Sequence, residues 1–413
     1  MSVATTLRAR ELGPAFDLVA EYRPPRGFFL ERSGVGVCAW GALGPPLVTY
    51  GAGRIERLAE LVNERLSSIR VEAGEHVPLG VGAITFDDAG PATLVVPSHV
   101  VRREAGGATW RLDAEHETSG DEAGRWTGKA IPHEPFTGMQ VDAVPEPAAY
   151  ERAVAAASER IRSSELEKVV LARTLEIDSG RELDPKQLLW RARSVDPDCY
   201  AFAVPGSDAS VFVGASPELL AQTRGGEVRV NPLAGSAPRA GDPDEDRANA
   251  ERLRASDKER EEHAIAVRDV ASRLVPLCDE LHVPAEPELL STANVWHLST
   301  PIMGRLREGV AGVLSVVAAL HPTPAVGGSP LQVALDTIAD LESFERAIYT
   351  GGVGWVDANG DGEWAIALRC AELRGSTARL FAGAGVVAGS EPARELDETE
   401  RKFRALLDSL RWG

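Results

Sequence analysis

Long hydrophobic runs are missing from this sequence. No run of about 18 apolar residues occurs among its 413 residues, so a transmembrane helix is not expected. The first residues, MSVATTLRARELG, also lack the apolar centre of a secretory signal peptide. The four cysteines (Cys38, Cys199, Cys278 and Cys370) are scattered and form no C-x-x-C motif. We therefore expect a cytoplasmic protein without disulfides or a zinc site.

Positive charge is in short supply. The chain has 44 lysine and arginine residues against 62 aspartate and glutamate residues, which gives a net charge of −18. Such a charge repels nucleic acids and anionic membranes, so neither is expected as a partner. It also repels small anions at long range. An anionic substrate would therefore need a site that is locally positive.

Lysine is rarer still. The basic residues include only five lysines: Lys129, Lys168, Lys186, Lys258 and Lys402. A GC-rich genome explains the excess of arginine without any functional reason. Arginine cannot release its proton in a protein, whereas a buried lysine can. A lysine that lies in a cleft is therefore a candidate base.

Hydrophobic patterning predicts helices and strands along the chain. Helical spacing covers 54–69 and the long charged region 244–278, whereas 168–177 reads as a strand and 349–388 as a series of strands. The segment 103–145 is rich in Gly, Asp, Glu and Pro, and we interpret it as surface strands and loops. This order of elements predicts an α+β protein with large, mainly antiparallel sheets.

Two acidic pairs suggest a metal site. Glu259 and Glu262 stand three residues apart on one predicted helix, and Glu395 and Glu398 repeat that spacing on the last one. Residues three apart share a helix face, so two adjacent helices would present four carboxylates to one point. Such oxygen-rich sites suit Mg²⁺. The alternatives are solvated acidic faces and, for Lys402, a simple ion pair with Glu398.

Four further residues could take part in chemistry. Glu218 follows a strand in GASPELL and is either a general acid lining a cleft or an exposed turn residue. Lys168 opens the apolar strand EKVVLAR and is either a solvated strand end or a desolvated base with a lowered pKa. His297 in VWHLST and His321 in LHPTPA lack metal-ligand spacing, and each has a structural role as its alternative.

Two glycine-containing segments could bind an anion. The backbone N–H groups of PLAGSAPR (232–239) and FAGAGVVAGS (381–390) could cradle a carboxylate or a phosphate. Neither matches a Walker motif or G-x-G-x-x-G, so nucleotide binding is not expected. Tight turns are the alternative explanation of these glycines.

The order of the motifs carries a resemblance. KVVLAR, GASPELL, PLAGS, KEREEH, WHLST, HPTPAVGG, YTGGVGW, ALRCAEL and AGAGVVAGSEPARELDETERK resemble the chorismate-utilising enzymes. That family includes isochorismate, salicylate, anthranilate and aminodeoxychorismate synthases. The match covers about 145–410. It implies a single large chorismate-binding domain over 1–413, an antiparallel β-sandwich flanked by helices, with about 1–140 completing the sheets.

The resemblance also implies roles. Glu262 and Glu398 would bind Mg²⁺ directly, Glu259 and Glu395 would hold its waters, and the metal would bind the ring carboxylate of chorismate. The substrate-binding residues would be His297, Tyr349, Arg369, Gly383, Gly385, Lys402, Ala234, Gly235 and Ser236.

A few positions indicate the branch of the family. Anthranilate synthases usually carry glutamine where Lys168 stands, and aminodeoxychorismate synthases carry lysine where Ala234 stands. The chain thus resembles the members that use water. Lys168 would deprotonate the water that attacks C2, and Glu218 would protonate the departing C4 hydroxyl. The expected activity is that of an isochorismate synthase, with a product that feeds menaquinone or catechol siderophores.

Three alternatives remain open. WHLST and GGVGW look closer to isochorismate synthases, but a salicylate synthase would share the first step and then eliminate pyruvate. An ammonia-using synthase with an amidotransferase partner is disfavoured by Lys168. An inactive chorismate-binding protein is disfavoured by the intact Lys168, Glu218 and four glutamates. We expect a monomer that needs no amidotransferase subunit.

Overall fold

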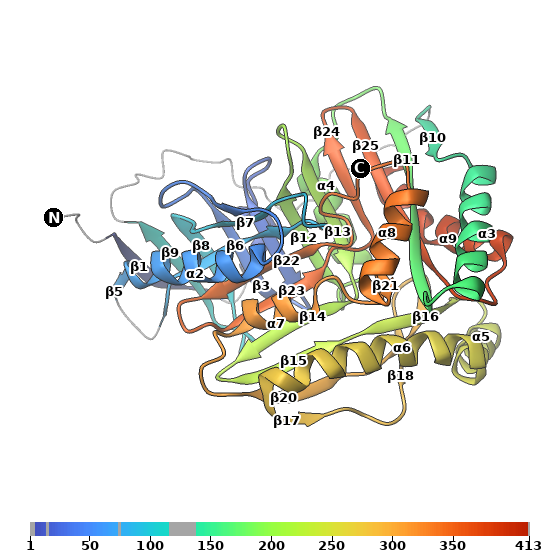
Figure 1. The fold of residues 1–413 in the computed structure, drawn as a ribbon. Helices are drawn as coiled ribbons and strands as arrows, with labels where there is room; N and C mark the ends of the chain where they lie inside the picture. Colours follow the sequence, from blue (N-terminus) through green and yellow to red (C-terminus); the bar gives the residue numbers. More distant parts are fainter. Residues whose placement is uncertain (1–4, 14–15, 73–75, 115–137, 412–413) are drawn as a thin grey trace.

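Two large β-sheets form the body of the molecule. The computed structural model describes residues 5–13, 16–72, 76–114 and 138–411. The sheets are flanked by helices, so the predicted α+β class is confirmed (Figure 1). Lys129, and the part of the predicted surface strands and loops that falls at 115–137, lie outside the described residues.

The described strands are short. Their bounds are β1 Thr6–Leu12, β2 Phe28–Arg32, β3 Val35–Trp40, β4 Leu47–Thr49, β5 Arg70–Glu72, β6 Leu79–Ile84, β7 Ala92–Val95, β8 His99–Arg103, β9 Thr109–Ala114, β10 Gln140–Val144, β11 Lys168–Asp178, β12 Tyr200–Pro205, β13 Val211–Ser216, β14 Leu219–Arg224, β15 Glu227–Asn231, β16 Leu233–Pro238, β17 Cys278–His282, β18 Glu288–Ser291, β19 Val295–Ser299, β20 Ile302–Leu306, β21 Gly328–Ser329, β22 Gly352–Asp357, β23 Gly362–Ile366, β24 Cys370–Arg374 and β25 Thr377–Val386.

The helices lie between and after these strands. Their bounds are α1 Leu18–Glu21, α2 Arg54–Ser67, α3 Pro147–Ser163, α4 Pro185–Val195, α5 Pro243–Ala255, α6 Asp257–Leu274, η1 Val275–Leu277 (a 3₁₀ turn), α7 Val313–Leu320, α8 Leu331–Leu341 and α9 Pro392–Arg411. No helix in the described part of the chain is long and apolar enough to cross a membrane.

The strands are arranged in three sheets. The 13-stranded sheet has the order β10-β11-β25-β24-β13-β12-β2-β3-β8-β9-β1-β5, with β21 paired to β11. The 9-stranded sheet has the order β17-β20-β15-β14-β23-β22-β6-β7-β4, and β16, β19 and β18 form a 3-stranded sheet. Pairing among the described strands is antiparallel except between β1 and β5. Each of the two large sheets therefore contains strands from both the beginning and the end of the chain, in two adjacent blocks.

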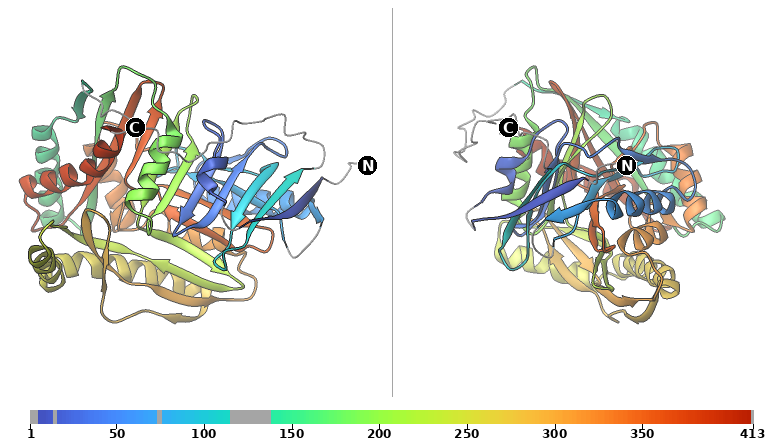
Figure 2. Two further views of the ribbon diagram at one scale, coloured as in Figure 1. Left: turned by 180° about the vertical axis from the view of Figure 1, so that it is seen from behind. Right: turned by 90° about the vertical axis from the view of Figure 1, so that its left-hand side faces the viewer.

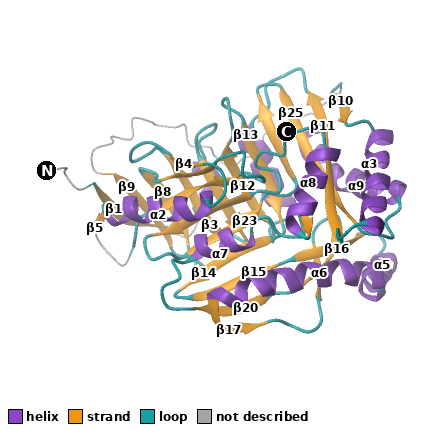
Figure 3. Cartoon of the chain, in the orientation of Figure 1, coloured by secondary structure: helices purple, strands orange, loops and turns teal. Residues whose placement is uncertain are grey.

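Side-chain alternation along the strands divides the core. Successive residues of a strand point to opposite faces. Phe28 and Leu30 of β2 enter the main hydrophobic interior, whereas Phe29 points to the other face of the large sheet. That second face is covered by α1, α4 and α9. Figure 2, seen from behind, shows α4 and α9 over the strands, and Figure 3 shows the helices around the outside of the sheets.

The pairing of β11 with β25, the longest among the described strands, positions the candidate active site. Strands β11 and β25 pair antiparallel from Val169 opposite Val386 to Asp178 opposite Thr377. Helix α9 packs on β25 and against α3, while α6 packs on β16. The start of β11, the end of β25 and the acidic helices α6 and α9 therefore converge at one end of the large sheet.

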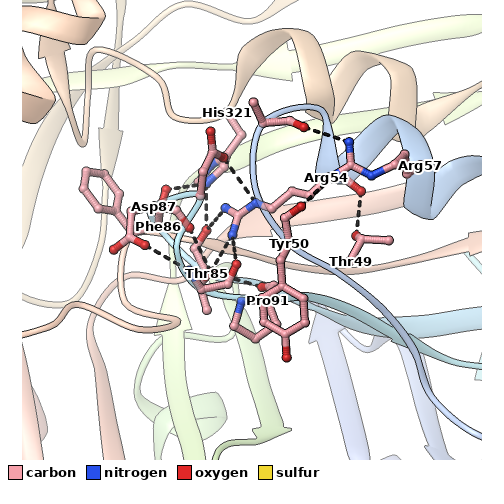
Figure 4. A network of polar contacts seen from close by, with 12 residues as sticks. Thr49, Tyr50, Arg54, Arg57, Thr85, Phe86, Asp87, Pro91 and His321 are labelled. Carbon is pink, nitrogen blue, oxygen red and sulfur yellow. Dashed lines mark hydrogen bonds and ion pairs between the residues drawn. The ribbon is translucent and has the colours of Figure 1, made fainter.

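A buried arginine at the start of α2 joins this helix to the segment that follows β6 (Figure 4). Arg54, 1% exposed at the start of α2, donates to the Thr85 carbonyl and hydroxyl oxygens, each at 2.7 Å, and to the Gly90 carbonyl at 2.5 Å. His321, after α7, stands 3.1 Å from the Thr85 carbonyl oxygen and 3.2 Å from that of Phe86. These contacts give His321 a structural place, in agreement with the alternative considered for it.

We predict that Arg54→Leu destabilises the fold. Buried carbonyl groups without a donor cost about 1–3 kcal/mol each, so the loss should reach about 3 kcal/mol. Denaturant unfolding monitored by fluorescence would measure it. Arg57→Leu is the matched control, since Arg57 is exposed on the same helix and bonds to exposed carbonyls. Equal stability of the two variants would contradict the role of Arg54.

Candidate active site

A cavity with an empty volume of about 770 Å³ lies where β11, β25, β16, α6 and α9 meet. Every predicted site residue except Lys168 and Glu395 lines this cavity. The predicted residues that line the cavity therefore come together from eight separate segments between residues 218 and 402. Lys168 and Glu395 lie directly behind its wall, where each forms an ion pair.

The 3-stranded sheet forms one wall. Ser236 of β16 pairs with His297 of β19, and the register shifts between Ala234 and Ser236. Gly235, within this irregularity, has a φ of +76°, a backbone conformation that favours glycine. A Cβ at Gly235 would stand 3.2 Å from the Glu259 Cβ and carbonyl oxygen. Glycine is thus needed here for β16 to lie against α6.

The first turn of α6 brings Glu259 to the same wall. The Ser256 hydroxyl caps the helix by accepting from the Glu259 N–H. The Glu259 Oε2 in turn accepts from the Ser236 N–H at 3.1 Å. Burial and the neighbouring charge of Glu262 raise the pKa of Glu259 to about 7. The negative charge of Glu259 is therefore unfavourable in this place, and a nearby cation would stabilise it.

One turn further on, Glu262 pairs with Lys168. The Lys168 Nζ stands 3.0 Å from the Glu262 Oε1, and both residues are buried. Burial raises the pKa of Glu262, but the charge and hydrogen bond of Lys168 outweigh burial and lower it. Gly385 of β25 faces this pair, and a Cβ there would stand 2.2 Å from the Glu262 Oε1. The pair needs the empty space beside Gly385.

Helix α9 contributes the second acidic pair. Glu395 is 2% exposed and bonds to the Lys258 Nζ at 3.0 Å, which links α9 to α6. Glu398 lies 2.7 Å from the Lys402 Nζ, so the ion pair considered from sequence spacing exists. Lys402 also donates to the Gly383 carbonyl at 2.8 Å and lines the cavity.

The four glutamates offer only oxygen ligands. Glu259 is coupled by charge to Glu262 and Glu398, and Glu395 is coupled to Glu398. In the described residues, no three or more Asp, Glu, His or Cys side chains stand close enough together to hold a metal ion as they are placed. Instead, a lysine ammonium group neutralises each of Glu262, Glu395 and Glu398. Carboxylate oxygens are suitable ligands for a hard divalent cation. Such a cation would neutralise these glutamates together with the lysines.

Glu218 is an isolated acid in the cavity wall. It is 2% exposed, and its Oε1 accepts from the Leu233 N–H at 3.4 Å. Burial raises the pKa of Glu218 to about 8, although this hydrogen bond and the charges of Lys168 and Lys402 act in the opposite direction. The side chain is thus mainly protonated at neutral pH. A buried, protonated carboxylic acid can donate its proton to a leaving group.

His297 and Arg369 form a polar contact opposite the acids. Arg369 donates from Nη2 to the His297 Nε2 at 2.6 Å, so that ring nitrogen carries no proton. Burial and the charges of Arg369 and Lys402 lower the pKa of His297 well below its ordinary value. Arg369 itself has a φ of +46°, an uncommon conformation that aims its side chain at the cavity. The histidine is neutral and the arginine supplies positive charge.

Tyr349 forms an aromatic edge of the cavity. Its ring stacks on Phe381 with centroids 5.0 Å apart and 15° between the planes. A Cβ at Gly383 would stand 3.1 Å from the Tyr349 hydroxyl oxygen. Burial raises the pKa of Tyr349, so its hydroxyl remains a hydrogen-bond donor.

Some residues that line the cavity, and an ion pair behind them, were not predicted from the sequence. Thr350, Ala325 and Val326 line the cavity, and the last two belong to the HPTPAVGG motif. A buried ion pair between Arg346 and Glu342, with Nη2 and Oε1 2.5 Å apart, stands behind them. The four-residue spacing of this pair was its only signal in the sequence.

Comparison with known proteins identifies the family of this chain. The family model described as chorismate binding enzyme matches residues 47–411. The chain belongs to that family. The isochorismate synthase DhbC of Bacillus subtilis is 39% identical to it over 399 residues, covering 95% of this chain and 95% of that protein. The predicted resemblance to the chorismate-utilising enzymes is confirmed.

Solved structures share the fold. DhbC of Bacillus anthracis superposes with a TM-score of 0.82 at 35% identity, covering 96% of this chain and 99% of that one. MenF, the menaquinone-specific isochorismate synthase of Escherichia coli, superposes with a TM-score of 0.81 at 27% identity, covering 98% and 94%. The arrangement of sheets and helices predicted from the family is confirmed by both.

We predict that Gly385→Ala breaks the pair of Lys168 and Glu262. The added methyl group would displace the glutamate carboxylate, and overpacking of this kind costs about 1–3 kcal/mol. Gly389→Ala is the control, because nothing lies within 4 Å of a Cβ at that position. Chemical denaturation of both variants would measure the difference. A Gly385→Ala protein as stable as the control would show that the space is not required.

Proposed function

We propose that the protein is an isochorismate synthase, which converts chorismate to isochorismate with Mg²⁺. One observation carries this proposal: the cavity is lined by Glu218, whose pKa is raised to about 8, and by Glu262, whose ion-pair partner is Lys168. Relatives with this activity in their names cover nearly the whole chain and support it. Their names include both dihydroxybenzoate-specific and menaquinone-specific enzymes, and the reaction is common to them.

The positive side chains of the cavity would bind one of the two carboxylates of chorismate. Arg369 and Lys402 supply charge, and Tyr349 supplies a hydroxyl donor. We assign the pyruvyl carboxylate to this side, together with the backbone at Gly383 and Gly385. His297 would contact the ring or its hydroxyl. The segment Ala234, Gly235 and Ser236 would line the opposite side.

The ring carboxylate would lie toward the glutamates. Glu262 and Glu398 would hold Mg²⁺ directly, and Glu259 and Glu395 would hold its waters. When bound, the cation would neutralise these carboxylates and the anionic substrate, and it would polarise the ring carboxylate. The raised pKa values of Glu259 and Glu395, caused by burial and by neighbouring acids, support a cation at this place.

The chemistry needs one base and one acid. In its neutral amine form, Lys168 would take a proton from water as the water oxygen forms a bond to C2 of the ring. The double bond shifts, the C4–O bond breaks, and Glu218 would give its proton to the departing hydroxyl. One water enters and one leaves, so the product is an isomer of the substrate. Arginine could not replace Lys168, because it does not release its proton.

Two residues indicate the nucleophile. Lys168 and Ala234 stand at positions that differ between branches of the family, and both favour water over ammonia. We therefore propose that the chain acts without an amidotransferase subunit, as a monomer. Salicylate synthase activity would require pyruvate elimination after the same first step.

The proposed function can be tested with purified protein. Chorismate would be incubated with the protein and Mg²⁺, and the products separated by chromatography. We expect isochorismate, no dependence on glutamine or ammonia, and no turnover in excess chelator until Mg²⁺ is restored. Salicylate with pyruvate would identify the other water-using activity. Consumption of chorismate in excess chelator would exclude the metal assignment.

We predict that Glu218→Gln lowers kcat about 10²–10⁴-fold, the usual contribution of general acid catalysis. In the native enzyme, kcat/KM should fall as the pH rises through about 8, because Glu218 then loses the proton it must donate. Glu227→Gln, at an exposed position at the start of β15, is the matched control. A loss below about tenfold in kcat would assign the acid to another group.

We predict that Lys168→Ala and Lys168→Arg bind chorismate but lose almost all turnover. Water activation fails in both variants, so the reverse reaction from isochorismate should fail as well. Turnover in both directions and chorismate affinity would be measured separately. Lys186→Ala, which removes a lysine far from the cavity, is the control. A variant at Lys168 that retains more than about a tenth of kcat in either direction would rule out this base.

A further inference from the structure

A second, smaller pocket adjoins the active-site cavity. We call it the outer pocket; it is lined by Ser236, Ala237, Pro238, Val295, Glu398, Arg401 and Lys402 and has an empty volume of about 220 Å³. Ser236, Glu398 and Lys402 also line the main cavity. The two spaces therefore meet where β16 faces α9.

The positive side chains that line the two pockets are Arg369, Lys402 and Arg401. Two of them are already engaged. Arg369 donates to His297 at 2.6 Å, and Lys402 bonds to Glu398 at 2.7 Å and to the Gly383 carbonyl at 2.8 Å. Arg401 is half-buried, and within the described ranges it makes no hydrogen bond or ion pair. Of these three side chains, Arg401 is therefore the one without a bonded partner among the described residues.

The surroundings make such a charge useful. The chain carries a net charge of −18, and Glu259, Glu262 and Glu398 line the cavity itself. A dianion that approaches this site meets long-range repulsion before it reaches Arg369. The Arg401 guanidinium group adds a positive charge beside the junction and so opposes this repulsion at short range.

We propose that Arg401 is the capture residue for the anionic substrate: its guanidinium group binds a carboxylate of the substrate beside the outer pocket before the substrate passes to Arg369 and Lys402. This inference rests on the proposed function, because it takes the substrate to be a dianion. The guanidinium group suits the role, since it presents a fork of donors that matches a carboxylate. Arg401 acts on binding and does not take part in the proton transfers.

The test compares kcat and KM for chorismate in the native enzyme, Arg401→Gln, Arg401→Glu and Arg404→Gln. Arg404 lies on the same helix but is exposed and lines neither pocket, so it is the matched control for loss of one positive charge. Each protein is assayed at about 0.02 M and about 0.5 M salt, because added salt shortens the reach of exposed charges. Thermal unfolding checks that all four proteins are folded.

We expect Arg401→Gln to lower kcat/KM about 3–10-fold at low salt through KM, with kcat unchanged. Arg401→Glu should lose more, and both losses should shrink at high salt while Arg404→Gln follows the native enzyme. The proposal is overturned if the Arg401 variants match Arg404→Gln at low salt, if the loss is the same at both salt concentrations, or if it lies in kcat.

Failure of the proposed function would look different. The native enzyme would then not turn over chorismate at all. Calorimetric titration with chorismate at the two salt concentrations would still decide the role of Arg401. Weaker low-salt binding by Arg401→Gln than by Arg404→Gln would support capture of the anion, and equal or absent binding in both would overturn it.

Discussion

A buried lysine and a buried glutamate, Lys168 and Glu262, stand 3.0 Å apart where β11 faces α6. Either charge alone would be costly to bury, by several kcal/mol, so each requires the other. The pair also restricts which side chains can lie beside it. Gly385 must lack a side chain, which in turn fixes the register of β25 on β11, because a shift by one residue would turn the glycine away.

A second buried pair keeps the cavity walls in place. Arg346 donates to the Val170 carbonyl of β11 and to the Val326 carbonyl, at 2.7 and 2.8 Å. Its partner Glu342 accepts from the Ala172 N–H at 2.7 Å. One ion pair thus joins the strand that begins with Lys168 to the HPTPAVGG loop. The cavity walls therefore depend on two charged side chains, Arg346 and Glu342, that bond to backbone groups from distant parts of the sequence.

Some of this arrangement could be predicted from sequence because it is local. The spacing of Glu259 with Glu262 on a helix, and of Glu398 with Lys402, follows from 3.6 residues per turn, and both were found as expected. The branched residues at 168–177 indicated a strand, and β11 forms there.

Other features depend on contacts between distant segments. The sequence could not show that Lys168 pairs with Glu262, that Lys258 links α6 to Glu395, or that Glu218 is buried. These facts arise from strand order and helix packing, which short patterns do not encode. The family resemblance supplied the set of residues, but the charge partners became visible only with the fold.

The pairing of β11 with β25 has a consequence for how the chain acquires its pocket. The strand that begins with Lys168 is synthesised long before its partner, and α9 with Glu395, Glu398 and Lys402 follows later still. Until then the start of β11 lacks β25, although Glu262 and β21, which also pair with it, have already been synthesised. Folds rich in such non-local pairings close their loops slowly. During translation the nascent chain must therefore leave its most strongly charged interior open until the ribosome has passed residue 402.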